Sequence, residues 1–600
     1  MRAALMTFRS PIRDIDFALN AIAGLDAVAA TGAFPDYDPE LGAAILEAAG
    51  QFADGVLAPI NRQGDLNGGK YANGAVTAAP GYVEAYQSFA EGGWAGLAAD
   101  PEHGGQGLPK ALELAAFESF HAANMAFGLC PMLSLAAIEA LSHVGTDRQK
   151  ELYLSRLVSG EWTGAMVLTE PQAGSDLGAL TATATPNGDG TYALSGQKIF
   201  ITWGDHDATD NIVHLVLARL PDAPKGSKGI SLFLAPKIMV ADDGTLSERN
   251  SFRPVGVEHK LGIHASPTCV MSYEGATAEL VGEPNQGLAH MFIMMNAARL
   301  AVGVQGVGIA ERAYQAALAY ALDRRQGRSI WTGEANAPIF DHPDVRRMLV
   351  VMKARIAAAR AICLSCGVAS DLARHAATED ERRAWKGRED LFVPIAKAWS
   401  TDMACEVASM GVQVHGGMGF IEETGAAQHY RDARITPIYE GTNGIQAGDL
   451  VGRKLSQDGG AAAKALIVEM KAVVPALAQL LPGKPVERLA AGIESVEDAT
   501  LWMLDRKAEA DSGADVLAGS DAYLKLLGDV VGGWMLAKGA LEADRRLKAD
   551  DGGDRAWLQS KIDLYEAYAA NVLGHCSARL AAVGQGGDVL KRLGAEVLGA

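Results

Sequence analysis

Four stretches of the sequence carry side chains that can move protons, bind phosphate or pack on a ring. Two of them contribute hydroxyl groups and a phenylalanine. The third contributes three arginines, and the fourth a glycine-rich loop followed by a glutamate. Carboxylates accept protons, hydroxyls donate and accept hydrogen bonds, and glycine lets backbone approach a phosphate closely. In chain order the stretches are 168–176, 196–202, 324–328 and 413–446.

Most standard catalytic motifs are absent. The chain has no GxxxxGK[ST] phosphate loop, no HExxH zinc motif, no GxSxG serine elbow and no strand-GxGxxG-helix unit. P-loop, hydrolase and nicotinamide-dependent functions therefore lose their support. His415-Gly416-Gly417 resembles an esterase oxyanion loop, but without a GxSxG serine such a loop has nothing to serve.

The charge balance argues against nucleic acid and anionic membrane surfaces as partners. The chain has 53 Lys and Arg residues against 72 Asp and Glu residues, a net charge of −19. This is the wrong sign for binding a phosphate backbone. The 49% of hydrophobic and 21% of charged residues are ordinary for a globular protein, so we expect the whole chain to fold.

Six cysteines are too sparse for a disulfide framework in a chain of 600 residues. They indicate a reducing compartment, and no signal peptide precedes the first charged residues, so we expect a cytoplasmic protein. Cys363 and Cys366 have the spacing of a metal or redox pair, but no second pair or histidine cluster accompanies them. We interpret both as core residues of a helix and expect no bound metal.

The hydrophobic periodicity predicts four domains. A helical domain at 1–160 is followed by a β domain at 161–280, a helical bundle at 281–455 and an appended helical domain at 456–600. Strands are predicted at 181–185, 192–194, 212–218, 230–234 and 268–271. In the third and fourth domains, helices are predicted at 288–328, 342–376, 391–414, 443–455, 460–481, 494–510, 521–548 and 554–583.

The most apolar window, 291–310, is long enough to span a bilayer. It carries Arg299 at its middle and three glycines towards its end, which is costly in lipid. We therefore expect a buried helix there and no transmembrane segment.

In this helical-β-helical order, the four stretches resemble the acyl-CoA dehydrogenase family of flavoenzymes, over residues 40–455. The appended helices, the stretch 9–14 and the loop 204–207 resemble its longer branch, which includes the 3-methylmercaptopropionyl-CoA dehydrogenases. The resemblance implies a mainly α fold with a β-barrel-like middle domain, FAD as cofactor and an acyl-CoA thioester as substrate. The implied reaction removes a proton from Cα and a hydride from Cβ and gives the trans-2-enoyl-CoA.

Glu440 matches the position of the family's catalytic base, just before Gly441 and Thr442. The resemblance implies that two groups donate hydrogen bonds to the thioester oxygen: the backbone N–H of Glu440 and a ribityl hydroxyl of FAD. A glutamate before a turn is otherwise most often a surface residue. Some related branches place the base on the helix of Arg299, at the position of Ala298, and alanine cannot accept a proton.

Ten residues match family positions that bind FAD. The resemblance implies contacts with the flavin ring or pyrophosphate for the first five, and places Arg324 and the glycine loop on the neighbouring subunit's cofactor. Taken singly, each Thr or Ser would be interpreted as a turn residue. The ten are Leu168, Thr169, Ser175, Phe200, Thr202, Arg324, Gln413, Gly416, Gly417 and Thr442.

Arg299, Ser175 and His206 are the candidate substrate-binding residues. An arginine inside an apolar helix is costly unless it meets an anion or carbonyl groups, and Arg299 matches a family arginine near the CoA chain. A structural salt bridge is the alternative. His206 and Asp207 can line the acyl pocket or cap a turn, and the sequence favours neither.

The resemblance implies a homodimer that passes electrons to an electron-transferring flavoprotein. Two other functions stay open at this point: an oxygen-using acyl-CoA oxidase, and a non-catalytic binding protein on the same scaffold. The net charge and the intact context of Glu440 disfavour the second of these. The acyl group cannot be derived from the sequence, although short or medium thioesters such as 3-methylthiopropionyl-CoA fit the branch.

Overall fold

The computed structural model describes residues 8–509, 511–549 and 554–600. The chain forms two compact units. The β unit comprises Ala49–Pro109 and Ala123–Ala301, and the helical unit comprises Met1–Ala48, Lys110–Ala122 and Val302–Ala600. The predicted fold class, mainly helical with a central β domain and extra C-terminal helices, is confirmed. The four domain ranges stay a prediction.

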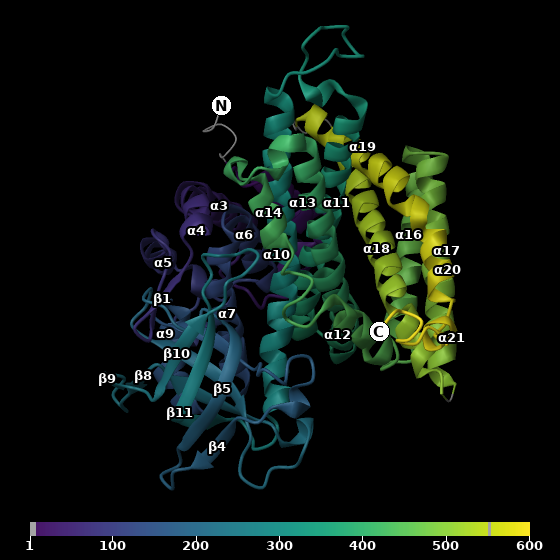
Figure 1. Ribbon diagram of the computed structural model, residues 1–600. Helices are drawn as coiled ribbons and strands as arrows, with labels where there is room; N and C mark the ends of the chain where they lie inside the picture. The colour runs from purple at the N-terminus through teal and green to yellow at the C-terminus, as the bar shows by residue number, and fades with distance from the viewer. Residues whose placement is uncertain (1–7, 510, 550–553) are drawn as a thin grey trace. The chain divides into compact units, whose positions relative to one another are not determined.

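A seven-stranded sheet dominates the β unit (Figure 1). Its strand order is β3-β6-β7-β11-β5-β4, and β10 pairs with β11 off this path. Only β3 and β6 pair in parallel, and all the other pairs are antiparallel. The strands are β3 (Thr163–Val167), β4 (Thr183–Pro186), β5 (Tyr192–Thr202), β6 (Ile212–Ala218), β7 (Ser231–Pro236), β10 (Phe252–Val257) and β11 (Thr268–Val281).

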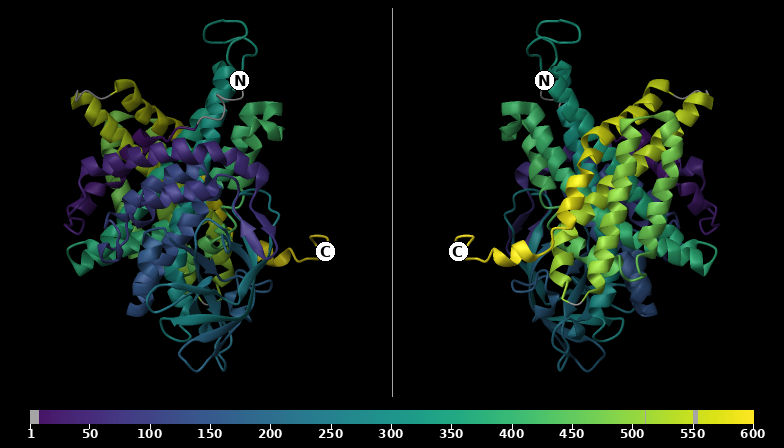
Figure 2. Two further views of the ribbon diagram at one scale, coloured as in Figure 1. Left: turned by 90° about the vertical axis from the view of Figure 1, so that its left-hand side faces the viewer. Right: turned by 90° about the vertical axis from the view of Figure 1, so that its right-hand side faces the viewer.

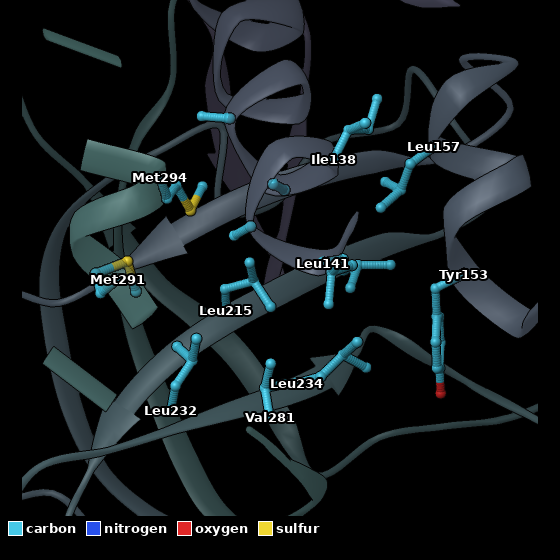
Figure 3. Close-up of a cluster of buried hydrophobic side chains, with 14 of the residues drawn as sticks. Ile138, Leu141, Tyr153, Leu157, Leu215, Leu232, Leu234, Val281, Met291 and Met294 are labelled. Carbon is cyan, nitrogen blue, oxygen red and sulfur yellow. The ribbon is translucent and has the colours of Figure 1, made fainter. Parts of the chain in front are cut away.

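The apolar run of β6 explains its place inside the sheet. All seven of its residues are buried, as expected for a strand covered on both faces. One side of this sheet packs on α7 and on the first turns of α10, through Leu141, Leu215 and Met291 among others (Figure 3). Two small hairpins complete the strands: β1 (Lys70–Ala72) with β2 (Ala75–Thr77), and β8 (Ile238–Val240) with β9 (Leu246–Arg249).

Helices precede the sheet in the chain, and one long helix follows it. The helix α10 (Gly287–Asp323) begins in the β unit, and its larger part belongs to the helical unit. The earlier helices are α3 (Pro39–Phe52), α4 (Ala58–Asn67), α5 (Tyr82–Glu91), α6 (Lys110–Ala123), α7 (Met125–Val144), α8 (Asp147–Gln149) and α9 (Ser155–Val158).

Besides the N-terminal helices, the helical unit contains two groups of helices: α10 to α15, and α16 to α21. The helices α16 to α20 run side by side, yellow-green to yellow in Figure 2, and α11 packs against α18 and α19. The N-terminal helices are α1 (Ile12–Phe17) and α2 (Leu25–Ala29). The rest are α11 (Pro343–His375), α12 (Glu379–Pro394), α13 (Ser400–His415), α14 (Ala426–Ala433), α15 (Asn443–Asp449), α16 (Ala461–Leu480), α17 (Lys484–Ala508), α18 (Gly513–Ala549), α19 (Arg555–Asn571), α20 (Cys576–Val583) and α21 (Asp588–Arg592).

Several helix boundaries differ from the predicted ones. The helix expected to begin at 391 begins at Glu379, and the helix expected to begin at 521 begins at Gly513. Two other boundaries have a local physical reason. The helix expected to reach residue 328 ends at Asp323, because the backbone of 324–338 pairs with itself: Gln326 N–H donates to the Ala337 carbonyl at 2.8 Å. This arm extends beyond the ends of α10 and α11 (Figure 1). The helix expected to begin at 494 begins at Lys484, where Pro485 occupies the first turn, a position that tolerates proline.

Among the described residues, three helical stretches are long and apolar enough to cross a membrane, judged by length and composition alone. They are Pro39–Asn67, Met125–Val144 and Gly287–Asp323. In the second and third, most of the apolar window is buried inside the protein. The window 291–310 therefore forms a largely buried helix, as predicted from Arg299 and the glycines.

The N-terminal helix α1 is fastened to the helical unit by one carboxylate. Asp14 forms ion pairs with Lys353 of α11 at 2.7 Å and with Lys561 of α19 at 2.5 Å. The indole of Trp557 donates to the same carboxylate at 3.3 Å. Burial alone would raise the pKa of Asp14, but the two lysines outweigh it and hold this pKa well below its usual range. The stabilisation is therefore present above pH 4 and lost at lower pH.

We expect Asp14→Asn to lower the free energy of unfolding by about 3 kcal/mol at pH 7, because the largely buried Lys561 loses its counter-charge and Lys353 keeps only its pair with Glu311 at 3.6 Å. Urea denaturation followed by circular dichroism measures this. The difference from the wild type should shrink as the pH falls below about 4. The control is Asp16→Asn two residues on, since the Asp16 carboxylate accepts a hydrogen bond from Asn20. Equal losses in both variants would contradict this account of the N-terminal helix.

Candidate functional site

Glu440 lies in the turn between α14 and α15, and its backbone is left-handed. Its φ is 56°, and the next residue, Gly441, has a φ of 81°. Left-handed backbone is disfavoured for a residue with a side chain by about 1–2 kcal/mol. Such strain persists only where surrounding contacts impose it, and it often marks a functional position.

Asn443 anchors this turn to the segment 397–402, which comprises the end of a π-helical turn and the start of α13. Its side-chain oxygen accepts from Lys397 Nζ at 2.9 Å, and its Nδ2 donates to the Ala398 carbonyl at 3.0 Å and to Asp402 Oδ1 at 2.7 Å. Lys397 is fully buried in the π-helical turn Ile395–Trp399, which leads into α13. Neither Lys397 nor Asn443 was identified as functional from the sequence.

Two further side chains fix the backbone on either side of Glu440. Gln446 Nε2 donates to the carbonyls of Glu440 at 3.4 Å and Gly441 at 3.3 Å. Tyr439 donates its hydroxyl proton to Gln305 Oε1 in α10 at 2.5 Å. Burial raises the pKa of Tyr439 well above its usual value, and the nearby charge of Glu440 raises it further. The half-buried Glu440 carboxylate therefore stands beside a phenol that stays protonated.

In the β unit, four of the first five candidate cofactor residues lie in or along β5. The carbonyl of Thr169 accepts from Ile199 N–H at 2.9 Å, so the segment 168–176 lies along β5. Phe200 has a φ of 60° and exposes 57% of its surface, which is unusual for a phenylalanine within a strand. Thr202 pairs with Thr268 of β11 at the end of β5, and Ser175 lies exposed in the segment itself.

In the helical unit, four of the remaining candidates cluster where α10 and α13 end. The rings of Tyr320 and His415 are in contact, with centroids 4.5 Å apart and planes tilted by 30°, so the two helix ends lie side by side. Arg324 directly follows α10 and donates to Gln326 Oε1 at 3.3 Å. The exposed candidates at the end of α13 are Gln413, Gly416 and Gly417.

The glycine pair leaves open space at this end of α13. Gly416 has a φ of 60°, and a Cβ added at Gly416 or Gly417 would meet no atom within 4 Å. The backbone there is accessible from outside. Thr442 is the N-cap of α15: its hydroxyl accepts from Ile445 N–H at 3.3 Å, so its side chain already has a structural role.

Arg299 is 3% exposed inside α10. Its guanidinium lies 5.6 Å from the ring centre of Phe292 and donates to Asn296 Oδ1 at 3.3 Å. Neither contact is an ion pair. The predicted role of Arg299 near a CoA chain stays a prediction.

His206 caps a turn and does not offer a ring nitrogen to a substrate. Its Nδ1 accepts from Ala208 N–H at 3.1 Å, and its Nε2 lies 2.9 Å from the Thr163 hydroxyl. Burial lowers the pKa of His206 to about 3, so the ring is neutral. Of the two alternatives for His206, these contacts favour the turn cap, and the substrate contact stays a prediction. Asp207 accepts from Ala78 N–H at 2.8 Å, which is also a structural contact.

The cysteine pair of α11 is structural. Cys363 and Cys366 are buried free thiols, and burial raises the pKa of both. A reactive thiol would instead have a lowered pKa and access to solvent. These features agree with the interpretation of the pair as core residues.

Four family models match consecutive parts of the chain. The acyl-CoA dehydrogenase N-terminal, middle and C-terminal domains match residues 40–161, 165–276 and 285–455. The acetyl-CoA dehydrogenase C-terminal-like model matches residues 466–593, which includes most of the appended helices.

Known relatives match nearly the whole chain. The 3-methylmercaptopropionyl-CoA dehydrogenase of Ruegeria pomeroyi is 48% identical over 98% of this chain and 99% of its own length. A broad-specificity linear acyl-CoA dehydrogenase of Mycobacterium tuberculosis is 32% identical over 94% of this chain and 95% of its own. The structure of an acyl-CoA dehydrogenase complexed with FAD from Bacillus anthracis shares the fold, with a TM-score of 0.72 at 22% identity, over 93% of this chain and 91% of that one.

We expect Asn443→Ala to lower the free energy of unfolding by about 2 kcal/mol, since the buried ammonium of Lys397 loses a hydrogen-bond acceptor. Urea denaturation measures the change. The matched control is Asn571→Ala, because the Asn571 side chain donates to the Ala567 carbonyl one helical turn away in the same unit. If Asn443→Ala is no more destabilising than Asn571→Ala, Asn443 does not anchor the Glu440 turn.

Proposed function

The chain belongs to the acyl-CoA dehydrogenase family, and on that premise we propose that its substrate is a short-chain acyl-CoA, with 3-methylmercaptopropionyl-CoA as the first candidate. It is an oxidoreductase with acyl-CoA dehydrogenase activity. The substrate proposal is supported by the relative from Ruegeria pomeroyi, whose name states this substrate and which matches the chain nearly end to end.

The single observation that carries the proposed catalytic assignment is the strained turn at Glu440. Its carboxylate would accept the α-proton of the thioester, as the family's base does. The left-handed backbone and the anchors at Asn443 and Gln446 fix the direction in which the Glu440 side chain leaves the turn. The backbone N–H of Glu440 would donate to the thioester oxygen, where negative charge develops as the proton leaves.

The residues present fit the cofactor that the family implies, FAD. An exposed aromatic ring at Phe200 and the hydroxyl groups of Thr202 and the exposed Ser175 suit a ring system with a polar edge. The exposed guanidinium of Arg324 and the open backbone at Gly416 and Gly417 suit a pyrophosphate. When bound, FAD supplies the acceptor for the hydride that leaves Cβ.

We propose a homodimer in which Arg324 and Gln413 serve the cofactor of the second copy. This is supported by the arm 324–338, which extends outward and exposes 65% of Ile330 and 58% of Trp331. Exposed apolar side chains of this size commonly mark an interface. We also propose an electron-transferring flavoprotein as the electron acceptor and the cytoplasm as the location, both from the family resemblance.

We expect Glu440→Gln to keep FAD and bind acyl-CoA but to lose flavin reduction by roughly 10²–10⁴-fold, because an amide of the same shape cannot accept the α-proton. Anaerobic stopped-flow absorbance of the flavin measures this rate. The control is Glu423→Gln, an exposed glutamate in the turn Glu422–Thr424, which should reduce at the wild-type rate. Fast reduction in Glu440→Gln would place the base elsewhere.

We expect Arg324→Ala to weaken FAD binding roughly tenfold or more, because a charge-assisted contact is worth about 1.5–3 kcal/mol. Fluorescence titration of the apoprotein with FAD measures the affinity, and added FAD should restore activity. Arg325 is the matched control, since its guanidinium donates within the arm, to Glu334 at 3.4 Å and to the Asn336 carbonyl at 3.2 Å. An equal loss in Arg325→Ala, or unchanged affinity in Arg324→Ala, would contradict the assignment.

A further inference from the structure

We propose that the buried ion pair between Lys198 and Glu170 is the positioning device of the flavin-binding edge: it fixes the segment 168–176 against the bulge of β5 and so sets the affinity for FAD. The inference rests on the proposed function for its ligand. The two residues of the pair have no role in the proposed function as stated above.

Lys198 reaches from β5 into the segment 168–176. It is fully buried, and its Nζ donates to the Leu168 carbonyl at 2.8 Å and pairs with Glu170 Oε1 at 2.9 Å. One ammonium group thus holds the backbone just before Thr169 and the side chain just after it. Two of the candidate flavin residues, Leu168 and Thr169, are placed by this lysine.

Glu170 ties the same segment to the approach of β4. Its Oε1 also accepts from Ala182 N–H at 3.0 Å, and its Oε2 accepts from Thr181 N–H at 2.7 Å. The Thr181 hydroxyl and the Gln172 amide donate to Oε2 as well, at 2.9 and 2.6 Å. A carboxylate with this many donors suits an ionised state.

Both members of the pair are charged at neutral pH. Burial would raise the pKa of Glu170, but Lys198 and the backbone N–H groups lower it to about 2. Burial lowers the pKa of Lys198 to about 8, against the opposing effect of Glu170. At pH 7 the lysine therefore keeps its proton and the glutamate has lost its own.

The pair sits beside an irregularity in β5 that aims Phe200 outward. Ile201 pairs with Cys269 and Lys198 with Met271, so β5 contains one more residue than β11 between these pairs. Such a bulge locally breaks the ladder and re-aims a side chain. Here the Ile199 N–H donates to the Thr169 carbonyl instead, and Phe200 takes its left-handed φ of 60°.

The energetics favour positioning over stability as the role of the pair. A buried ion pair pays for desolvation of both charges, and replacing such a pair by apolar residues is often neutral or stabilising. What the pair adds is a fixed geometry: it joins the segment 168–176, β5 and the start of β4 at one point. Both side chains are at most 2% exposed, so neither is accessible from outside this edge.

The test measures FAD affinity and amide exchange in Glu170→Gln and Glu170→Asp. Apoprotein is titrated with FAD by fluorescence quenching, at a temperature where circular dichroism shows each variant folded. Hydrogen exchange of the apoprotein reports the amides of Thr181, Ala182 and Ile199. Glu170→Asp keeps the charge and shortens the side chain, so it remains informative if Glu170→Gln does not fold.

The control is Glu279→Gln in the same unit. Glu279 accepts from Arg148 at 2.9 Å and from Gln149 at 3.3 Å, and lies eight residues along β11 from Met271, the partner of Lys198. At about 3.4 Å per residue, the chain from Met271 to Glu279 spans at most about 27 Å. The Glu279→Gln variant tests whether the loss of any carboxylate in the β unit weakens FAD binding.

We expect FAD affinity to fall tenfold or more in Glu170→Gln and threefold or more in Glu170→Asp, with faster exchange at Ile199 and with Glu279→Gln unchanged. Wild-type affinity in both Glu170 variants, or an equal loss in Glu279→Gln, would overturn the proposal. Failure of the wild-type chain to bind FAD would instead overturn the proposed function. In that case the exchange data still test whether the Lys198–Glu170 pair fixes the segment 168–176. Faster amide exchange at Thr181 and Ile199 in Glu170→Gln supports this, and unchanged exchange refutes it.

Discussion

The candidate site depends on a glutamate held in a backbone conformation that its own side chain disfavours. Glu440 and Gly441 are both left-handed, and only the glycine adopts that region without cost. Asn443 and Gln446 supply the contacts that impose the turn, and the buried Lys397 connects it to the start of α13. A proton acceptor on a rigid turn needs no rearrangement before it reacts, which is what preorganised catalysis requires.

The β unit also contains a left-handed residue that is held by surrounding contacts, and there the residue is a phenylalanine instead of a glutamate. Phe200 is also left-handed, and the surrounding contacts again come from residues that do no chemistry: the bulge of β5, the Thr169 carbonyl and the Lys198–Glu170 pair. In both units one of the left-handed non-glycine residues is a residue assigned to the reaction or its cofactor. The supporting residues are buried polar groups, which cost desolvation energy and are explained by the geometry that they fix.

The sequence was enough to predict the fold class and the stretches that hold the candidate site. The apolar run of β6 and the long periodic helices have strong local patterns, and the family resemblance located Glu440, Arg324 and the glycine loop. The tethers could not be predicted, because Lys198 and Glu170 lie 28 residues apart in sequence, and Lys397 and Asn443 lie 46 apart. The left-handed backbone of Glu440 and Phe200 contradicts their local preference, and His206 needed its actual neighbours to decide between two roles.

The most direct test of the central claim is anaerobic mixing of the wild-type protein, loaded with FAD, with 3-methylmercaptopropionyl-CoA. Flavin absorbance is followed together with the mass of the thioester. The account predicts bleaching of the oxidised flavin band and a product that has lost one proton and one hydride, with the new double bond between Cα and Cβ. An unchanged flavin spectrum with this substrate and with other short acyl-CoA thioesters would contradict it.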